Sequence, residues 1–342
     1  MNPVHRIELS PEDALRLHVL LAGDVLAVRL DEGACTLHAL TPQGAACIRL
    51  NPAGRVERYF QRVRELLGGH ALGSPGGYPV HLRRWTRMGQ AGEKNLAALL
   101  KLGAPEAVMA VAHASGLTDE LARRVWWASQ NLATTEIARV MLMHPAVRAG
   151  AMGQVLADHL IEHLPFETDP VAAMHSVRAV LAAGLLDAEK RAQLWTKGKR
   201  RPHYLVGFLE SLPDDLPPEP ARALPPHLPG TAAARLLARC YSGAGQAYLG
   251  AAELALDKPP AHEAVYLLLD LLGAYFAAGR DAGALPIPRA EATALEALAR
   301  LSQAAAEPIL TKTTAVGPLM RRHLEPLFAP IIGHLRNLRG IV

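Results

Sequence analysis

The sequence predicts a mainly α-helical protein with a small N-terminal α+β region. The chain of 342 residues is 50% hydrophobic but only 5% aromatic, and its apolar residues are chiefly Ala and Leu, which lose little conformational freedom in a helix. Only three short segments near the N-terminus favour β-structure. With a mean hydropathy of +0.10, a chain of this length buries at least one sizeable core and divides into two or three domains.

The first predicted domain covers residues 1–90. Ser10-Pro11-Glu12-Asp13 is a typical helix start, and this helix should continue to about Ala22. An amphipathic helix is expected over 56–67, with Gly68-Gly69 as its end. Between these helices, segments separated by turn-forming residues predict a small antiparallel meander. Its expected strands are 25–30, 35–40 and 46–50.

A second domain, an antiparallel helical array, is predicted over residues 91–213. Its short connections imply that successive helices run antiparallel. Gly116-Leu117-Thr118-Asp119 followed by Trp126 resembles Gly184-Leu185-Leu186-Asp187 followed by Trp195, 68 residues or twice 34 further on. This period suits stacked helical pairs of the HEAT or tetratricopeptide type, and an irregular helical bundle is the alternative. The expected helices are 96–102, 105–114, 119–129, 135–143, 152–164, 170–182, 188–197 and 204–212.

A proline-rich segment, residues 214–230, is predicted to be an extended linker, because proline fixes φ and donates no backbone hydrogen bond. A C-terminal helical domain should follow over 231–342. Its last helix, 320–338, is expected to be broken by Pro326 and Pro330. A dimerisation bundle fits this pattern, so a homo-oligomer is compatible with the sequence. The other expected helices are 231–256, 261–278 and 289–306, with 282–288 as a loop.

The segment 72–89 concentrates glycine, aromatic residues and positive charge. Residues 55–94 carry a net charge of +5, while the whole chain carries +4. Guanidinium groups pair with phosphate and aromatic rings stack on bases, so this segment suits contact with RNA or DNA. The preferred interpretation is a β-hairpin or ordered loop docked on the helical domain, with its aromatic rings packed inward and its arginines solvated. Neither a GKS or GKT loop nor a GxGxxG fingerprint is present. The candidate partner-binding residues are Tyr78, Arg83, Arg84, Trp85 and Arg87.

A second basic cluster, Lys197 to Arg201, lies between two predicted helices. Lys199, Arg200 and Arg201 complete the set of candidate partner-binding residues. A solvated turn explains such a run without a function, whereas proximity to the first cluster would create one large surface for an anionic partner.

Sequence motifs for catalysis are absent, so no catalytic residue and no cofactor are predicted. His159 and His163 share one helix face, but no third ligand stands at motif spacing and the HExxH order is missing, so no metal is predicted. Three cysteines, Cys35, Cys47 and Cys240, form no CxxC pair and are expected to be reduced thiols.

Charged residues interrupt the apolar stretches at the N-terminus, so neither a signal peptide nor a transit peptide is expected. The longest apolar helices are too short to span a bilayer. The sequence therefore predicts a soluble, cytoplasmic protein without a membrane partner.

Four stretches of the chain resemble the DsrS family. They are SPEDALRL near the start, HALGSPGGYPVHLRRWTRMGQ from His70, PEAVMAVAHASGLTDELARRVWWA from Pro105 and YLVGFLESLPDDLP from Tyr204. The resemblance covers about residues 10–217. DsrS is encoded among the dissimilatory sulfite reductase (dsr) genes of sulfur-oxidising bacteria, and the resemblance carries over no active-site residue.

The resemblance implies a cytoplasmic accessory protein of the reverse sulfite reductase pathway, in which stored sulfur is oxidised to sulfite. Two functions fit this setting. The preferred one is a non-enzymatic accessory or regulatory protein that binds a protein of the sulfite reductase system, with RNA as the alternative partner. The second is a sulfur carrier that uses Cys35, Cys47 or Cys240, since other proteins of the pathway relay sulfur on cysteines. The predicted strand positions of Cys35 and Cys47 do not favour a reactive thiolate.

Overall fold

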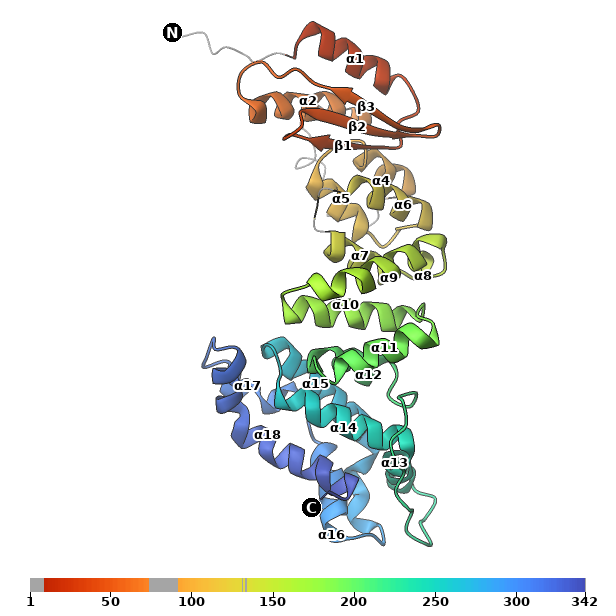
Figure 1. Cartoon of the computed structure of the whole chain (residues 1–342), viewed down its shortest axis with the longest axis vertical. Helices are drawn as coiled ribbons and strands as arrows, with labels where there is room; N and C mark the ends of the chain where they lie inside the picture. Colours follow the sequence, from red (N-terminus) through yellow and green to blue (C-terminus); the bar gives the residue numbers. More distant parts are fainter. Residues whose placement is uncertain (1–8, 74–91, 131, 133, 342) are drawn as a thin grey trace. The chain divides into compact units, whose positions relative to one another are not determined.

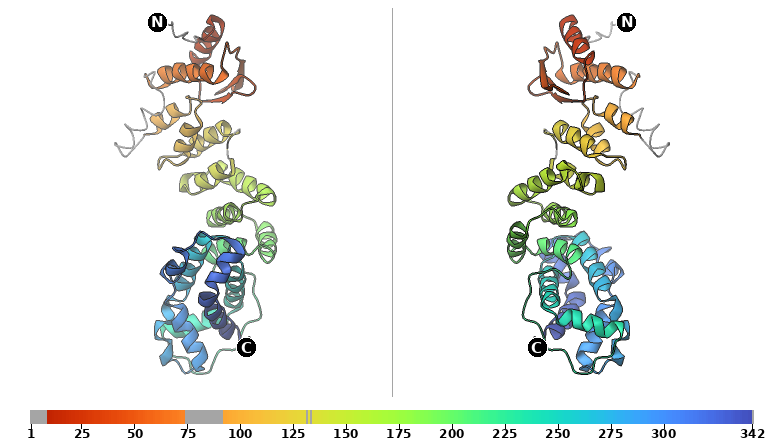
Figure 2. Two further views of the ribbon diagram at one scale, coloured as in Figure 1. Left: turned by 90° about the vertical axis from the view of Figure 1, so that its left-hand side faces the viewer. Right: turned by 90° about the vertical axis from the view of Figure 1, so that its right-hand side faces the viewer.

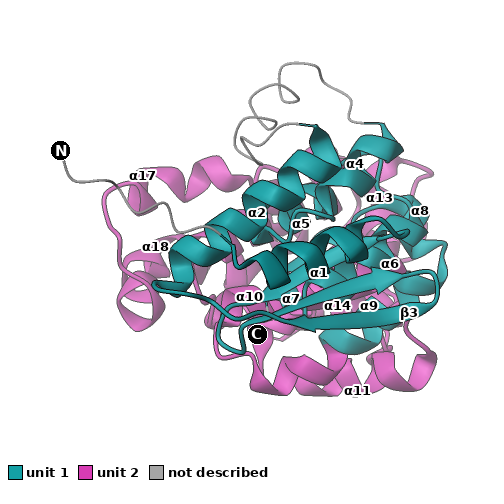
Figure 3. Ribbon diagram, turned by 90° about the horizontal axis from the view of Figure 1, so that it is seen from above, with its two compact units in different colours: residues 1–160 teal, residues 161–342 magenta. Residues whose placement is uncertain are grey.

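The computed structural model describes residues 9–73, 92–130, 132 and 134–341. The chain is mainly helical with one small three-stranded sheet near the N-terminus, which confirms the predicted fold class (Figure 1). Two compact units, Met1–Leu160 and Ile161–Val342, are coloured separately in Figure 3. This division differs from the predicted one, because the expected linker 214–230 lies inside the second unit.

The first unit begins with an antiparallel meander, as predicted. Strands β1 (Ala27–Asp31), β2 (Thr36–Thr41) and β3 (Gly44–Arg49) follow one another in the sheet. Helices α1 (Pro11–Leu21) and α2 (Val56–Leu72) pack their apolar side chains against the sheet in one core. Ser10 caps α1 by accepting a hydrogen bond from the Asp13 N–H, so the predicted helix start is confirmed.

Helix α2 continues past the glycine pair that was expected to end it. Gly68 and Gly69 lie inside the helix, which ends at Gly73 with φ of +65°. A glycine costs about 1 kcal/mol relative to alanine in a helix. The buried face, which includes Tyr59, Phe60 and Val63, offsets that cost by packing into the core. The prediction was wrong because tertiary packing outweighs the low helix propensity of the two glycines.

The helices after α2 in the first unit pack chiefly against their neighbours in sequence. Asp119 links two of them, because its carboxylate accepts hydrogen bonds from the backbone N–H groups of Ala151 and Met152 at 3.2 and 3.0 Å. Both side views show these helices in successive layers (Figure 2). They are α4 (Glu93–Leu99), α5 (Pro105–Ala112), α6 (Asp119–Ala128), α7 (Thr134–Leu142), α8 (Pro145–Arg148) and α9 (Ala151–His163), whose last turn belongs to the second unit.

The internal sequence repeat has a structural counterpart at two helix N-caps. Thr118 caps α6 and Asp187 caps α11 (Ala188–Gly198). Trp126 and Trp195 each follow their cap by eight residues. The spacing from the preceding glycine to the tryptophan, in contrast, is ten residues after Gly116 and eleven after Gly184. Trp126 packs edge-on against His159 and Trp195 against Phe208.

The second unit has a large helical core of its own. The proline-rich segment runs over this core as a strap that is bonded to the helices. The Arg222 N–H donates to the Tyr241 carbonyl at 2.9 Å, and the Arg222 guanidinium donates to the Leu338 carbonyl at 2.8 Å. Besides α11, the helices are α10 (Pro170–Ala183), α12 (Leu205–Ser211), α13 (Ala232–Tyr241), α14 (Gly243–Asp257), α15 (His262–Tyr275), α16 (Arg289–Leu298), α17 (Glu307–Leu310) and α18 (Gly317–Arg339), with short 3₁₀ turns η1 (Leu164–Phe166), η2 (Pro202–Tyr204), η3 (Ala277–Ala284) and η4 (Gln303–Ala305).

Two helix predictions in the second unit are corrected. The expected helix 231–256 is two helices, because Ser242 adopts an extended backbone and its hydroxyl caps α14 by accepting from the Gly245 N–H. In contrast, α18 is one continuous helix that contains Pro326 and Pro330. Both prolines are exposed, while the opposite face packs into the core, so burial of that face compensates for the lost backbone hydrogen bonds.

Candidate interaction site

The structure places only the second of the two predicted basic clusters. Tyr78, Arg83, Arg84, Trp85 and Arg87 lie outside the residues that the structure describes. Lys199, Arg200 and Arg201 lie in the turn between α11 and η2. This turn is the part of the predicted site that the structure describes.

Gly198 determines how closely the basic turn approaches the next helix. A Cβ atom on Gly198 would lie 2.7 Å from the Leu205 Cδ2 atom, so any other residue would require either the buried Leu205 side chain or the turn to shift. The turn follows the C-terminal end of α11, where the negative end of the helix dipole favours cations. Local backbone geometry therefore presents Lys199 and Arg200, both exposed, at a helix end that stabilises their charge.

Arg201 is held by its neighbours. Its guanidinium donates to the Tyr204 hydroxyl at 3.0 Å and lies 5.9 Å from the centre of that ring. Burial, together with the charge of Arg201, lowers the pKa of His203 to about 4. His203 is thus neutral at physiological pH and adds no charge to the cluster. Lys199, Arg200 and Arg201 are all exposed, and Arg201 is the one that Tyr204 holds in place.

An ion network joins α14, α18 and the proline-rich strap beside this turn. Glu253 accepts from Arg336 at 2.8 Å and from Arg339 at 2.9 Å, and Arg339 also pairs with Glu219 at 3.2 Å. Gly250 makes room for this network, because its Cβ position lies only 3.2 Å from the Arg339 guanidinium. The partly buried charges hold three separate segments of the second unit together.

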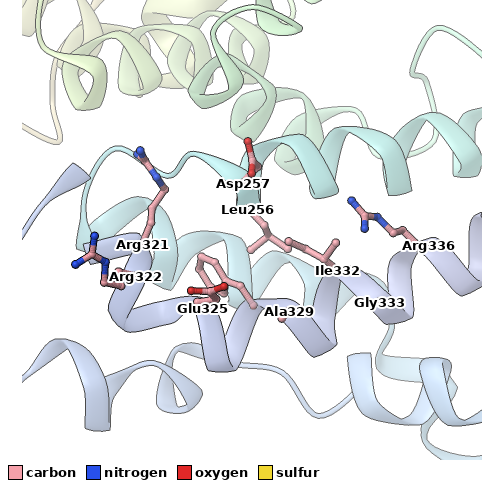
Figure 4. A pocket seen from close by; sticks show the side chains of 10 residues that line it. Leu256, Asp257, Arg321, Arg322, Glu325, Ala329, Ile332, Gly333 and Arg336 are labelled. Carbon is pink, nitrogen blue, oxygen red and sulfur yellow. The ribbon is translucent and has the colours of Figure 1, made fainter. Parts of the chain in front are cut away.

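Two hollows lie along α14 and α18, and the ion network contributes residues to both. The smaller, of about 250 Å³, is lined by Lys199, Glu219, Glu253, Arg339 and apolar groups. The larger, of about 470 Å³, is lined by apolar residues that include Leu256 and Phe328 and by three arginines. Figure 4 shows this hollow from close by. In the close-up, Arg321 and Arg322 lie toward one end of α18 and Arg336 toward the other. Both hollows combine apolar surface with guanidinium or ammonium groups.

The structure thus brings one predicted residue, Lys199, to a site that sequence reasoning missed. Glu219, Glu253, Arg336 and Arg339 were not singled out, although two arginines three residues apart in the last turn of a helix are a recognisable signal. Their acidic partners stand more than eighty residues away in sequence, and no local pattern connects them.

The cysteines differ in exposure. Cys47 is exposed in β3, Cys35 is half-buried, and Cys240 is fully buried. Cys35 lies in the turn before β2 with φ of +51°, which corrects its predicted strand position. Burial raises the pKa of the Cys240 thiol to about 12, although the nearby Arg239 acts in the opposite direction. Cys240 is therefore protonated and enclosed, and Cys47 is the accessible thiol among the three.

Across the described parts of the chain, no group of three or more His, Cys, Asp or Glu residues is arranged to hold a metal ion. Of the same residues, no helix combines the length and apolar character needed to cross a membrane. Searches with family models, curated proteins and solved structures found no match to this chain.

Proposed function

We propose that this chain is a non-enzymatic accessory protein of sulfur oxidation through the reverse dissimilatory sulfite reductase pathway, acting in the cytoplasm by binding a protein partner. The resemblance of residues 10–217 to the DsrS family supports the pathway. The observation that supports binding is the exposed basic turn, Lys199 and Arg200, beside an open hollow lined by Lys199. Such a surface suits an acidic face on the partner, because opposite charges steer association and fix its orientation.

Affinity capture from cells that are oxidising sulfur tests this function. We expect the immobilised full-length chain to retain subunits of the sulfite reductase system, identified by mass spectrometry. The double variant Lys199→Ala/Arg200→Ala should reduce retention about tenfold, because two exposed ion pairs contribute about 1–2 kcal/mol together.

Arg235→Ala/Lys312→Ala is the matched control, since both residues are exposed basic residues elsewhere in the second unit. The control should retain the partner like the wild type. The proposal fails if no protein of that system is captured, or if the two double variants behave alike.

The same experiment distinguishes RNA from protein. Nuclease treatment during washing leaves a directly bound protein in place and removes anything held through RNA. An RNA partner would make affinity fall steeply with salt, and Arg83→Ala, Arg84→Ala and Arg87→Ala would each reduce the salt slope by about one where the residue contacts a phosphate.

A sulfur carrier is the second candidate, and the exposed thiol of Cys47 is the observation that favours it. A thiolate at Cys47 would attack the outer, sulfane sulfur of a persulfide donor. The sulfur–sulfur bond of the donor breaks, and the donor is released as its thiol. We expect intact mass to rise by one sulfur atom on wild-type protein but not on Cys47→Ser. An unchanged wild-type mass, or an adduct that persists in Cys47→Ser, excludes Cys47 as the carrier.

A further inference from the structure

Strand β3 has an unpaired edge within the described part of the sheet. The strand order is β1, β2, β3, and the other outer strand, β1, is bonded through the Val28 N–H to the Leu100 carbonyl. Proteins protect open edges with proline, lysine or bulges. β3 contains neither proline nor lysine, and its register with β2 is continuous. Its one charged residue, Arg49, stands at the last position of the strand, so the rest of the edge lacks these protections.

The hydrogen-bond pattern identifies the groups that point outward. The Leu50 N–H donates to the Cys35 carbonyl, which marks this residue pair as hydrogen-bonded. Because such pairs alternate along an antiparallel ladder, the N–H and C=O groups of Ala45 and Cys47 point away from β2. The Arg49 carbonyl also points outward, where it accepts a hydrogen bond from Arg16 at 3.4 Å.

An apolar surface lies directly beside this edge. Leu15 and Val19 are one turn apart on α1, and their exposed fractions are 64% and 67%. With Leu20 and Ile48 they line a hollow of about 350 Å³, to which Arg16 also contributes. Among the described residues of the first unit, none covers the apolar side chains of α1 or the outward backbone groups of Ala45 and Cys47 at this place.

We propose that this surface binds a second copy of the chain, through antiparallel pairing of β3 with β3 around a two-fold axis at Ala46. In this register Ala45 and Cys47 of one copy pair with Cys47 and Ala45 of the other. The outward N–H and C=O groups of Ala45 and Cys47 are then all hydrogen-bonded to the other copy. The Arg49 carbonyl keeps its hydrogen bond to Arg16. The close, non-hydrogen-bonded position on the axis is taken by Ala46 of both copies, whose small side chain fits there. The α1 helices meet through Leu15 and Val19.

The charges at this surface of α1 and β3 favour a second copy of the chain as its partner over a charged peptide. Arg16 is paired with Glu12 on the same helix, so the apolar surface has no uncompensated charge to offer a charged partner. In the self-paired register Arg49 lies opposite residue 43 of the other copy, a glutamine. The two Arg49 residues stand six positions apart along the strands, about 20 Å, which exceeds the Debye length of about 8 Å. The two apolar surfaces therefore meet without an uncompensated charge between them, and the two Arg49 side chains are too far apart to repel each other strongly.

The small area of the proposed interface between the two copies predicts a reversible dimer. A six-residue strand with a helix beside it covers about 20 Å by about 15 Å. This is roughly 300 Å² on each copy, against about 800 Å² per partner in a standard interface. We expect a dimer that dissociates on dilution through the micromolar range.

Sedimentation velocity of the full-length chain over two decades of concentration tests the dimer. We expect a monomer–dimer equilibrium that Leu15→Glu/Val19→Glu weakens more than tenfold. Leu319→Glu is the matched control, because Leu319 is 52% exposed in the second unit, and it should leave the equilibrium unchanged. Ala45→Pro is an independent variant, since it removes an outward N–H that β2 does not use, and it should weaken the dimer as well.

Cross-linking reports the register. The two Cys47 residues are diagonal neighbours with Cα atoms about 7–8 Å apart, so a short bismaleimide should join two chains. We expect Cys47→Ser to abolish the cross-link and Cys35→Ser to retain it. A chain that stays monomeric at all concentrations, a dimer that Leu15→Glu/Val19→Glu and Ala45→Pro leave unchanged, or a cross-link that persists in Cys47→Ser overturns the proposal.

Discussion

Replacing Gly245 by alanine is expected to cost at least about 3 kcal/mol of stability in the second unit, among the largest effects of a single methyl group. A Cβ atom at this position would lie 1.9 Å from the Arg239 carbonyl oxygen and 2.7 Å from that of Cys240. Both obstacles are backbone atoms at the end of α13, so no flexible side chain can move aside. Urea denaturation followed by circular dichroism measures the loss.

Gly333→Ala is the matched control for this change. Gly333 lies inside α18, and apart from its chain neighbours and its own helix backbone no described atom lies within 4 Å of its Cβ position. Alanine there should raise stability by about 0.5–1 kcal/mol through helix propensity alone. If Gly245→Ala is as stable as Gly333→Ala, α13 and α14 do not approach each other as the structure describes.

Replacing Asp13 by alanine is expected to cost the first unit about 3 kcal/mol, because it leaves buried donors without an acceptor. The Asp13 carboxylate is fully buried and accepts hydrogen bonds from the Tyr59 hydroxyl and, at 2.9 Å, from the Asn51 N–H. These bonds join α1, α2 and the end of the sheet. Hydrogen exchange at the amides of β1 to β3 measures the loss in the first unit separately from the second.

The exposed Glu12 provides the control, because Glu12→Ala removes only its pair with Arg16 and should cost less than about 1 kcal/mol. Tyr59→Phe combined with Asp13→Ala should be less destabilising than the sum of the single changes, since the two side chains share a hydrogen bond. Additive losses would show that the two residues do not interact.

The Asp13 network also predicts a pH dependence. Burial alone would raise the pKa of Asp13, but hydrogen bonds from Tyr59 and the Asn51 N–H, with the charge of Arg16, hold it below the ordinary value of 3.8. A carboxyl group with a lowered pKa stabilises the fold above its unfolded value and loses that contribution as pH falls through the folded value. The stability difference between wild type and Asp13→Ala should therefore shrink below about pH 4.

Local signals predicted much of the secondary structure. Ser10, Thr118 and Asp187 accept hydrogen bonds at helix starts, and the turn formers between the β-leaning segments lie where the meander turns. Caps and turns depend on residues a few positions apart, so the sequence displays them directly. The exposed basic turn at Lys199 and Arg200 was found for the same reason, because charge runs usually remain solvated.

Predictions that depended on a single residue's propensity were less successful. Gly68-Gly69 did not end α2, and Pro326 with Pro330 did not break α18. In both helices an apolar face packs into a core and stabilises a conformation that the local residues disfavour. The ion network of Glu219, Glu253 and Arg339 was missed because its members come from three distant segments.

The sequence by itself determined that this protein is mainly helical, where most of its helices and strands begin, and that its basic residues gather in two places. Local hydrogen bonding and hydrophobic periodicity are sufficient for these features, since both are properties of neighbouring residues. Only the tertiary structure decided that the proline-rich segment is a bonded strap, that Lys199 lies at a hollow beside α14 and α18, and that α1 and β3 leave an apolar surface at an open edge. These features depend on which distant segments meet, and that is determined by the packing of the whole core.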